Sequence, residues 1–290
     1  MSDRHRPRMA QPIRSVVANH QLVAFFGLAF LWTWSFHLVV YLVVGPSPGI
    51  LQRGIVGAWG PLIAAGVVTW AANGDRREWA RQVTKWRLPL RLVLPAVVLP
   101  FLINGTIAAA TIHLLQGGSV TLVPSPWWHY VANFVVVLFL AGALEEFGWR
   151  GFAQPRLQER FSALVGAIVV GFAWTLWHLP MFYLYDVPAY DPSGYLTSYL
   201  WTLVVQSIVY AWLYNASGGS LLLPMIAHSL SNLPPLVGTV GPVGMPADVV
   251  PEILAALVVV GLILGYGIEY LAPSAPSPRI PGMSQRDRSG

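Results

Sequence analysis

The sequence predicts an all-α fold, a polytopic membrane helical bundle of about eight transmembrane helices with an interfacial amphipathic helix. Hydrophobic residues make up 55% of the 290 residues, charged residues only 10%, and the mean hydropathy is +0.58. Soluble domains carry about 25% charged residues, so this composition excludes an ordinary soluble protein. The apolar residues also form long runs, and the basic residues gather between alternate runs.

Eight apolar segments are of a length to cross a bilayer, which takes about 20 helical residues. Gly, Pro and Asn clusters separate them, as is typical of turns. The first run follows a polar, Arg-bearing stretch, but it is longer than the core of about 7–15 residues in a signal peptide. We therefore expect an uncleaved first transmembrane helix. The predicted spans are residues 22–44, 55–72, 92–115, 128–150, 162–185, 195–214, 220–236 and 253–270.

The basic residues predict the orientation of the bundle. Eight spans put both termini on one side, and with cytoplasmic termini sixteen of the seventeen Lys and Arg residues face the cytoplasm. Only Arg53 then lies outside, in agreement with the positive-inside rule. We predict a multi-pass protein of the cell membrane with cytoplasmic N- and C-termini. The pI of about 9.7 is then explained by contact with the lipid bilayer, not by nucleic-acid binding.

One membrane domain is expected, at residues 22–272, with a motif-bearing core at 128–236. Residues 1–21 form a cytoplasmic N-terminal segment. Residues 273–290, rich in Pro, Ser and Arg, form a cytoplasmic tail that we predict to be disordered.

The segment 76–91 alternates basic residues with the apolar residues Trp79, Val83, Trp86 and Leu88. This pattern favours a helix that lies along the cytoplasmic leaflet. A solvated loop is the alternative.

Polar residues of the kinds used in catalysis interrupt the apolar runs at three places. They are Glu145, Glu146 and Arg150 in EEFGWR, His178 at the end of FAWTLWH, and His228 and Asn232 in HSLSN. An ionisable side chain inside a bilayer is costly unless it is paired or wetted, so it indicates a functional site by default. The chain has no cysteine, which excludes disulfides, thiolate metal sites and a cysteine nucleophile.

The spacing of these residues predicts that they meet in one cavity. Glu145 lies 15 residues before the connection at 160–162 and His178 lies 16 residues after it. In antiparallel helices both residues would stand about 22–24 Å from the turn. A helix that continued to the connection would be too long to stay straight, so we expect a break near Gly151 or Pro155.

Two further pairs are spaced four residues apart, which places each pair on one helical face. His228 and Asn232 can therefore point into the same cavity. Glu146 and Arg150 are expected to form an ion pair that orients their helix.

The chemistry of these groups suits hydrolysis of a peptide bond. A carboxylate beside an imidazole can activate a water, and an amide with a second imidazole can stabilise an oxyanion. Glu145, His178 and His228 are also zinc-ligand types, although the H-E-x-x-H signature of soluble zinc proteases is absent. A zinc cofactor is therefore left open.

Each residue alone also has a structural explanation. His178, in an aromatic run, is of the kind that packs between helices, and Asn232 of the kind that bonds between helices. Glu146 with Arg150 fits an orienting ion pair better than a catalytic role. The combination of all these residues in three segments is what favours a functional site.

The three motifs resemble those of the CPBP family of intramembrane proteases, also called the ABI or CAAX-protease family. The family pattern is E-E-x-x-x-R, then an aromatic residue followed four positions later by His, then H-x-x-x-N/D, on three successive helices. The chain has Trp174 where the family usually has Phe. The motif-bearing resemblance covers about residues 140–235.

The resemblance implies an intramembrane endopeptidase that acts on a peptide or protein substrate at the membrane. By position, Glu145 would be the general base on a water, assisted by His178. His228 and Asn232 would stabilise the oxyanion. Glu146 and Arg150 would support the site. The resemblance also leaves a metalloprotease open, whose metal ligands would be Glu145, His178 and His228.

Two other classes stay open. A non-enzymatic membrane protein, such as an immunity or scaffold factor, would retain the polar residues as structure. A proton-coupled transporter would use Glu and His as a proton relay, but the repeats common in such transporters are not found in the sequence. Loss of function without loss of folding in Glu145→Gln would favour the enzyme.

Overall fold

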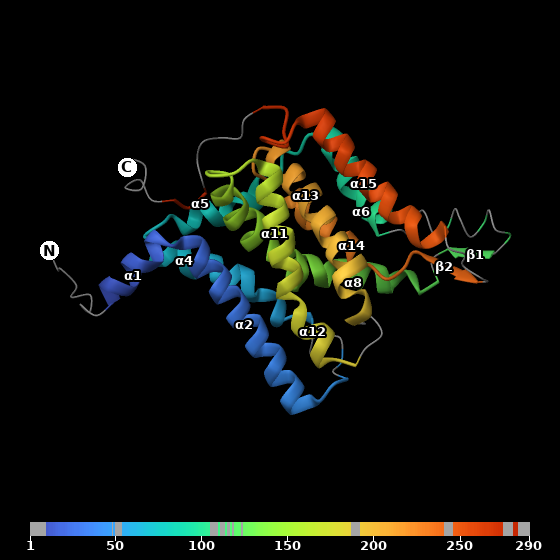
Figure 1. Ribbon diagram of the computed structural model, residues 1–290, viewed down its shortest axis with the longest axis horizontal. Coiled ribbons are helices and arrows are strands. Elements are labelled where there is room, and N and C mark those ends of the chain that lie inside the picture. Colours follow the sequence, from blue (N-terminus) through green and yellow to red (C-terminus); the bar gives the residue numbers. More distant parts are fainter. Residues whose placement is uncertain are drawn as a thin grey trace.

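The chain folds into a bundle of helices, with α11 near its centre and a small two-stranded sheet at one edge (Figure 1), as a computed structural model shows. The described part is mostly helical, and its one sheet has two strands. The predicted all-α membrane bundle is confirmed. The structure describes residues 10–47, 49, 54–104, 110, 114, 117, 119–122, 124–186, 192–240, 246–274 and 281–283.

The elements follow one another without a repeat of one unit. The first part of the chain contains α1 (Ala10–Asn19), α2 (Gln21–Val44), η1 (Gly57–Trp59), α4 (Gly60–Ala71), α5 (Arg76–Ala80), η2 (Arg81–Thr84) and α6 (Leu90–Ile103). The middle part contains β1 (Ser119–Leu122), α8 (Trp127–Leu140), η3 (Gly142–Glu145), α9 (Glu146–Gly148), η4 (Trp149–Ala153), α10 (Gln154–Leu157), α11 (Ala163–Trp177) and α12 (Leu179–Leu184). The last part contains η6 (Pro192–Gly194), η7 (Tyr195–Tyr199), α13 (Leu200–Ala216), α14 (Leu222–Ser231), β2 (Val237–Val240) and α15 (Pro246–Tyr266).

Each of the eight predicted spans contains a helix, but the helices differ in length. Three helical stretches of the described residues are long and apolar enough to cross a membrane, namely Gln21–Val44, Trp127–Leu157 and Ala163–Leu184. Other apolar helices are shorter, such as Leu222–Ser231. The number of eight crossings therefore stays a prediction, as do the orientation and the domain boundaries. Much of the predicted tail, residues 275–280 and 284–290, lies outside the described residues.

The helix α2 shows why the bundle suits a bilayer. It is apolar around its whole circumference, as is typical of buried or membrane helices. Phe25 and Ala29 on one side are fully buried, whereas Leu42 and Val43 are 71% and 79% exposed. Exposed apolar side chains in such number are unusual for a soluble surface and mark contact with another apolar phase.

The centre of the bundle is the pair α11 and α13, which pack closely against each other. The helix α13 is buried on all sides from Val205 to Asn215. Gly171 of α11 permits the close approach, because a Cβ atom there would lie 2.8 Å from the Cα atom of Val204. Small residues let membrane helices approach in this way.

The segment between α4 and α6 turns its apolar residues inward. Asp75 caps α5 by accepting hydrogen bonds from the amides of Arg77 and Glu78, and these bonds hold the pKa of its carboxyl below the usual value. Trp79 and Gln82 are buried. The helical part ends at Thr84, so the predicted interfacial helix is shorter than 76–91, because the chain is extended towards Pro89.

The strands β1 and β2 were not predicted from the sequence. They pair antiparallel, with Ser119 opposite Val240 and Leu122 opposite Val237. The two strands lie more than 100 residues apart in the chain, so no local turn signal announces the pairing.

Gly171→Ala should destabilise the bundle by about 1–3 kcal/mol, the usual cost of overpacking, because the methyl group would meet the backbone of Val204. Gly27→Ala in α2 is the matched control, since no atom lies within 4 Å of a Cβ atom there. The measurement is thermal unfolding of both variants in detergent. Equal midpoints for the two variants would contradict the close packing of α11 on α13.

Candidate active site

An irregular stretch of helix carries the paired glutamates. The helix α8 ends at Leu140, and Ala141 follows with φ −133° and ψ −127°, which are not helical angles. The chain then forms the 3-10 turn η3, the short helix α9 and the π-helical turn η4. The predicted break near Gly151 corresponds to η4, but the sharper break is at Ala141. π turns inside helices are frequent at functional sites.

Glu146 is the hub of the polar cluster. Its Oε1 atom accepts hydrogen bonds from Nη1 of Arg150 at 2.9 Å and from Nδ1 of His228 at 2.7 Å. Glu146 and Arg150 are fully buried, and His228 is only 3% exposed. The predicted ion pair of Glu146 and Arg150 is present, and it also binds α14 through His228.

The guanidinium of Arg150 lies between two aromatic rings. Its central carbon is 5.0 Å from the ring centroid of Trp174 and 5.0 Å from that of Tyr210. Such cation–π contacts are worth about 2 kcal/mol when desolvated. Within the described part of the chain, Nε and Nη2 of Arg150 and Oε2 of Glu146 have no hydrogen-bond partner. The cluster therefore holds buried charge through few direct bonds.

Glu145 lies beside this cluster with a different set of partners. Its Oε2 atom accepts hydrogen bonds from the indoles of Trp174 at 2.7 Å and of Trp149 at 3.2 Å. No described residue donates to Oε1. This atom is not completely buried, since it is absent from the fully buried polar atoms without a partner. Glu145 is also close enough to His228 to interact with it electrostatically. One carboxylate oxygen is thus fixed and the other is available.

The two imidazoles are each fixed through Nδ1. In His178, Nδ1 bonds the backbone oxygen of Trp174 at 2.8 Å, and since a carbonyl only accepts, Nδ1 carries a proton. In His228, Nδ1 faces Glu146. The Nε2 atoms of both rings bond no residue that the structure describes. Neither of these atoms is completely buried.

Space for the ring of His228 comes from the break after α8. A Cβ atom at Gly142 would lie 2.8 Å from Nε2 of His228. Glycine at this position therefore lets α14 bring the imidazole against the irregular stretch.

The structure places Asn232 differently from the other predicted residues. It follows the last turn of α14, is exposed, and donates from Nδ2 to the backbone oxygen of His228 at 3.1 Å. No hydrogen bond within the described residues joins it to Glu145 or to an imidazole ring. Glu145, Glu146, Arg150 and His228 thus form one cluster, with His178 beside it through Trp174 and Asn232 at its edge.

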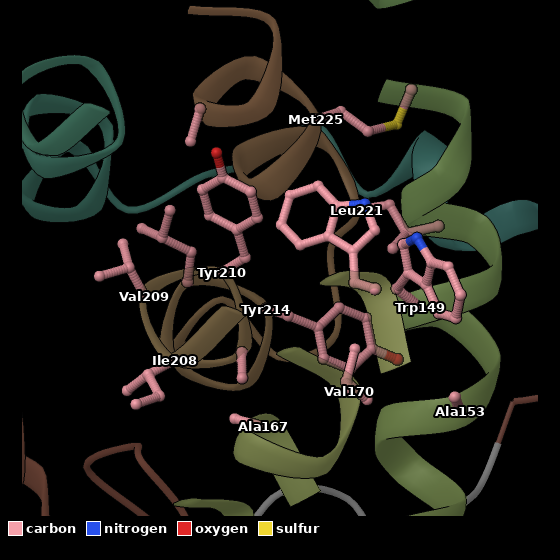
Figure 2. Packing of buried hydrophobic residues seen from close by; sticks show 14 of the residues in the cluster. Trp149, Ala153, Ala167, Val170, Ile208, Val209, Tyr210, Tyr214, Leu221 and Met225 are labelled. Atoms are coloured by element: carbon pink, nitrogen blue, oxygen red, sulfur yellow. The ribbon is translucent and has the colours of Figure 1, made fainter. Parts of the chain in front are cut away.

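Three residues that shape the site were not predicted from the sequence. Trp149 donates to Glu145, Tyr210 covers Arg150, and Gly142 admits His228. Figure 2 shows Trp149 and Tyr210 among the buried side chains that surround them. The spacing of four residues between Glu145 and Trp149 could have signalled the first contact. Nothing near Tyr210 in the sequence signals the second.

The atoms that could hold a metal ion are Oε1 of Glu145 and Nε2 of the two imidazoles, which bond no described residue. Each imidazole holds its Nδ1 on an oxygen, as metal-ligating histidines commonly do. Across the described ranges, however, no three His, Cys, Asp or Glu side chains gather closely enough to hold a metal ion.

Comparison with known proteins identifies relatives of this segment. Residues 126–234 match the family model described as type II CAAX prenyl endopeptidase Rce1-like. The chain is also 31% identical, over 150 residues, to CAAX prenyl protease 2 of Methanococcus maripaludis. This alignment covers 49% of the chain and 52% of the relative, so the chain spans about half the length of the relative that it matches.

The fold and the site define a polytopic helical membrane protein with a buried carboxylate–imidazole cluster. The family-model match contains all three motifs, from Glu145 to Asn232. Together with the similarity to the archaeal relative, it supports the CPBP family, as the motifs indicated.

Arg150→Met should lower the free energy of unfolding by about 3–5 kcal/mol, because the buried carboxylate of Glu146 loses its guanidinium partner and keeps only His228. The double variant Glu146→Gln with Arg150→Met should regain part of this loss, since it removes the unpaired charge. Denaturant unfolding in detergent measures both, with the exposed Arg160→Met as control. A single variant as stable as the control would contradict the central role of the pair.

Proposed function

We propose that this protein is an intramembrane endopeptidase of the CAAX-protease type, which hydrolyses a peptide bond of a substrate at the membrane. The observation that carries the proposal is the set of hydrogen bonds made by Glu145. One oxygen of its carboxylate is held by two indole N–H groups, while the other is available beside an imidazole. A fixed carboxylate with one available oxygen is suited to accept a proton from a water.

In the proposed reaction, a water lies between Oε1 of Glu145 and Nε2 of His178. Because Nδ1 of the neutral His178 carries the proton, Nε2 accepts a hydrogen bond and orients the water. Glu145 takes one proton as the water oxygen bonds to the carbonyl carbon of the substrate. The same proton then passes to the leaving nitrogen as the carbon–nitrogen bond breaks, which yields a carboxylic acid and an amine.

The oxyanion of the intermediate is assigned to His228 and Asn232. Nδ1 of His228 is directed at the carboxylate of Glu146, which leaves Nε2 as the ring nitrogen that can face the oxyanion. The exposed amide of Asn232 can turn from its own helix towards the substrate. Donors aimed at a developing oxyanion commonly contribute the largest part of such catalysis.

The substrate class follows from the comparison alone. The relative is named a CAAX prenyl protease, so we propose a prenylated CAAX-terminated peptide as the first substrate to test. Membrane proteins without a prenyl group are the second.

Glu145→Gln should lower the rate of cleavage by at least about 100-fold, the usual contribution of a general base, while the protein still folds. The amide oxygen of glutamine can keep the bonds from the indoles. Mass spectrometry of substrates in proteoliposomes measures cleavage, and the exposed Glu159→Gln is the matched control. Cleavage retained in Glu145→Gln would reject the general base. A wild-type protein that cleaves neither substrate class, with the variant still folded, would favour the immunity or scaffold alternative.

Peptide cleavage should not depend on zinc, because the proposed water is activated by Glu145 and His178 directly. The purified protein should contain far less than one zinc ion per chain, and 1,10-phenanthroline should leave the rate unchanged. Elemental analysis and the cleavage assay measure the two quantities. One zinc per chain, with activity lost on chelation and restored by zinc, would instead establish a metalloprotease.

A further inference from the structure

The start of α6 carries two kinds of exposed side chain in a fixed order. Arg87 and Arg91 are exposed, and no ion pair between described residues involves them. Trp86, Leu90 and Leu94 are 71%, 85% and 69% exposed. Two cationic side chains thus lie at the N-terminus of α6, and large apolar side chains follow along the helix.

The N-terminus of α6 adds a partial positive charge to that of the two arginines. Pro89, with φ −62°, is the residue before the first turn of the 14-residue helix. The first amides of a helix lack partners within it, and together with the helix dipole they favour an anion at this end. The guanidinium of Arg87 also lies over the ring of Trp86, at 5.6 Å. Charge of one sign is therefore concentrated at one place.

The segment that leads to this place is held firmly against the bundle. Trp79 donates from Nε1 to the oxygen of Phe147, and Lys85 donates from Nζ to the oxygen of Gly218 at 2.7 Å. Burial also lowers the pKa of Lys85. Lys85 is thus used in holding the fold, whereas Arg87 and Arg91 face outward.

The exposed apolar side chains continue along α6, away from its charged end. Leu90 and Leu94 lie on one face of α6, four residues apart. Val98, a further four residues along, is 40% exposed. Trp86 stands at the charged end, and tryptophan is enriched at the level of the lipid headgroups.

We propose that this end of α6 binds an anionic phospholipid. Its phosphate lies between Arg87 and Arg91 at the helix terminus, and one acyl chain lies along Leu90, Leu94 and Val98. The residues from 86 to 98 include no acidic side chain, so the cationic group of a zwitterionic headgroup finds no partner there. An anionic lipid is therefore preferred, and each arginine contributes about fivefold near an anionic surface.

The test uses the absence of cysteine from the chain. Leu94→Cys is labelled with bimane, and the protein is placed in phosphatidylcholine nanodiscs that contain dibrominated phosphatidylglycerol or, at the same mole fraction, dibrominated phosphatidylcholine. Bromine quenches the fluorophore only at contact. We expect stronger quenching by the anionic lipid, and a weaker preference at high salt because of screening. Equal quenching by the two lipids would overturn the proposal.

Two charge variants of the labelled protein locate the site. Arg87→Gln with Arg91→Gln should bring the quenching ratio of the two lipids to one. Arg76→Gln with Arg77→Gln is the matched control, since it removes the same charge from exposed positions of the same segment, and it should keep most of the preference. Equal loss in both would show that the basic segment as a whole, not this site, attracts the lipid. The readout is lipid binding, so it does not depend on proteolysis.

Discussion

Glu146 holds the site together, because one of its carboxylate oxygens accepts hydrogen bonds from both Arg150 and His228. Arg150 comes from the same irregular helix, and His228 comes from α14, so one carboxylate oxygen joins two segments that are 82 residues apart in the chain. A buried charge is tolerated only when it is paired and bonded. Separating α14 from this carboxylate would leave an unpaired charge in an apolar bundle, and this cost fixes the position of His228.

The proposed mechanism gives the two neighbouring glutamates different roles, with Glu145 as the general base and Glu146 as the residue that holds the cluster together. Two adjacent carboxylates on a regular helix would point about 100° apart and would share few partners. Here Glu145 is the last residue of a 3-10 turn and Glu146 is the first residue of α9, and a π turn follows, so each carboxylate has its own surroundings. Glu146 meets the guanidinium of Arg150 and the ring of His228, whereas Glu145 meets neutral indoles. The division of roles between the two glutamates thus originates in the irregular backbone.

The sequence was sufficient for the class of fold, for a helix within each predicted span, and for the choice of Glu145, Glu146, Arg150 and His228 as residues that meet. Apolar runs and the rarity of charge within them have direct physical consequences, so those predictions needed no partner information. The partners of each group were less accessible. The sequence pattern did not indicate that His228 meets Glu146, because that contact depends on the break at Ala141. It also did not indicate that Tyr210 covers Arg150, because α13 is buried on all sides and no single face of it is marked as the one that meets the site. The place of Asn232 at the helix end likewise depends on where α14 stops.

The irregular stretch creates backbone groups that must be satisfied, and the segment at the start of the bundle satisfies them. Carbonyl groups in a π turn lose their usual partners in the helix. Trp79 donates to the oxygen of Phe147, and Gln82 donates to the oxygen of Gly151. Tyr214 of α13 in turn bonds Gln82. The basic residues of segment 76–91 suggested only contact with the membrane surface. The same segment also supports the irregular helix that carries Glu145 and Glu146, so the position of these glutamates depends on residues near the surface of the bundle.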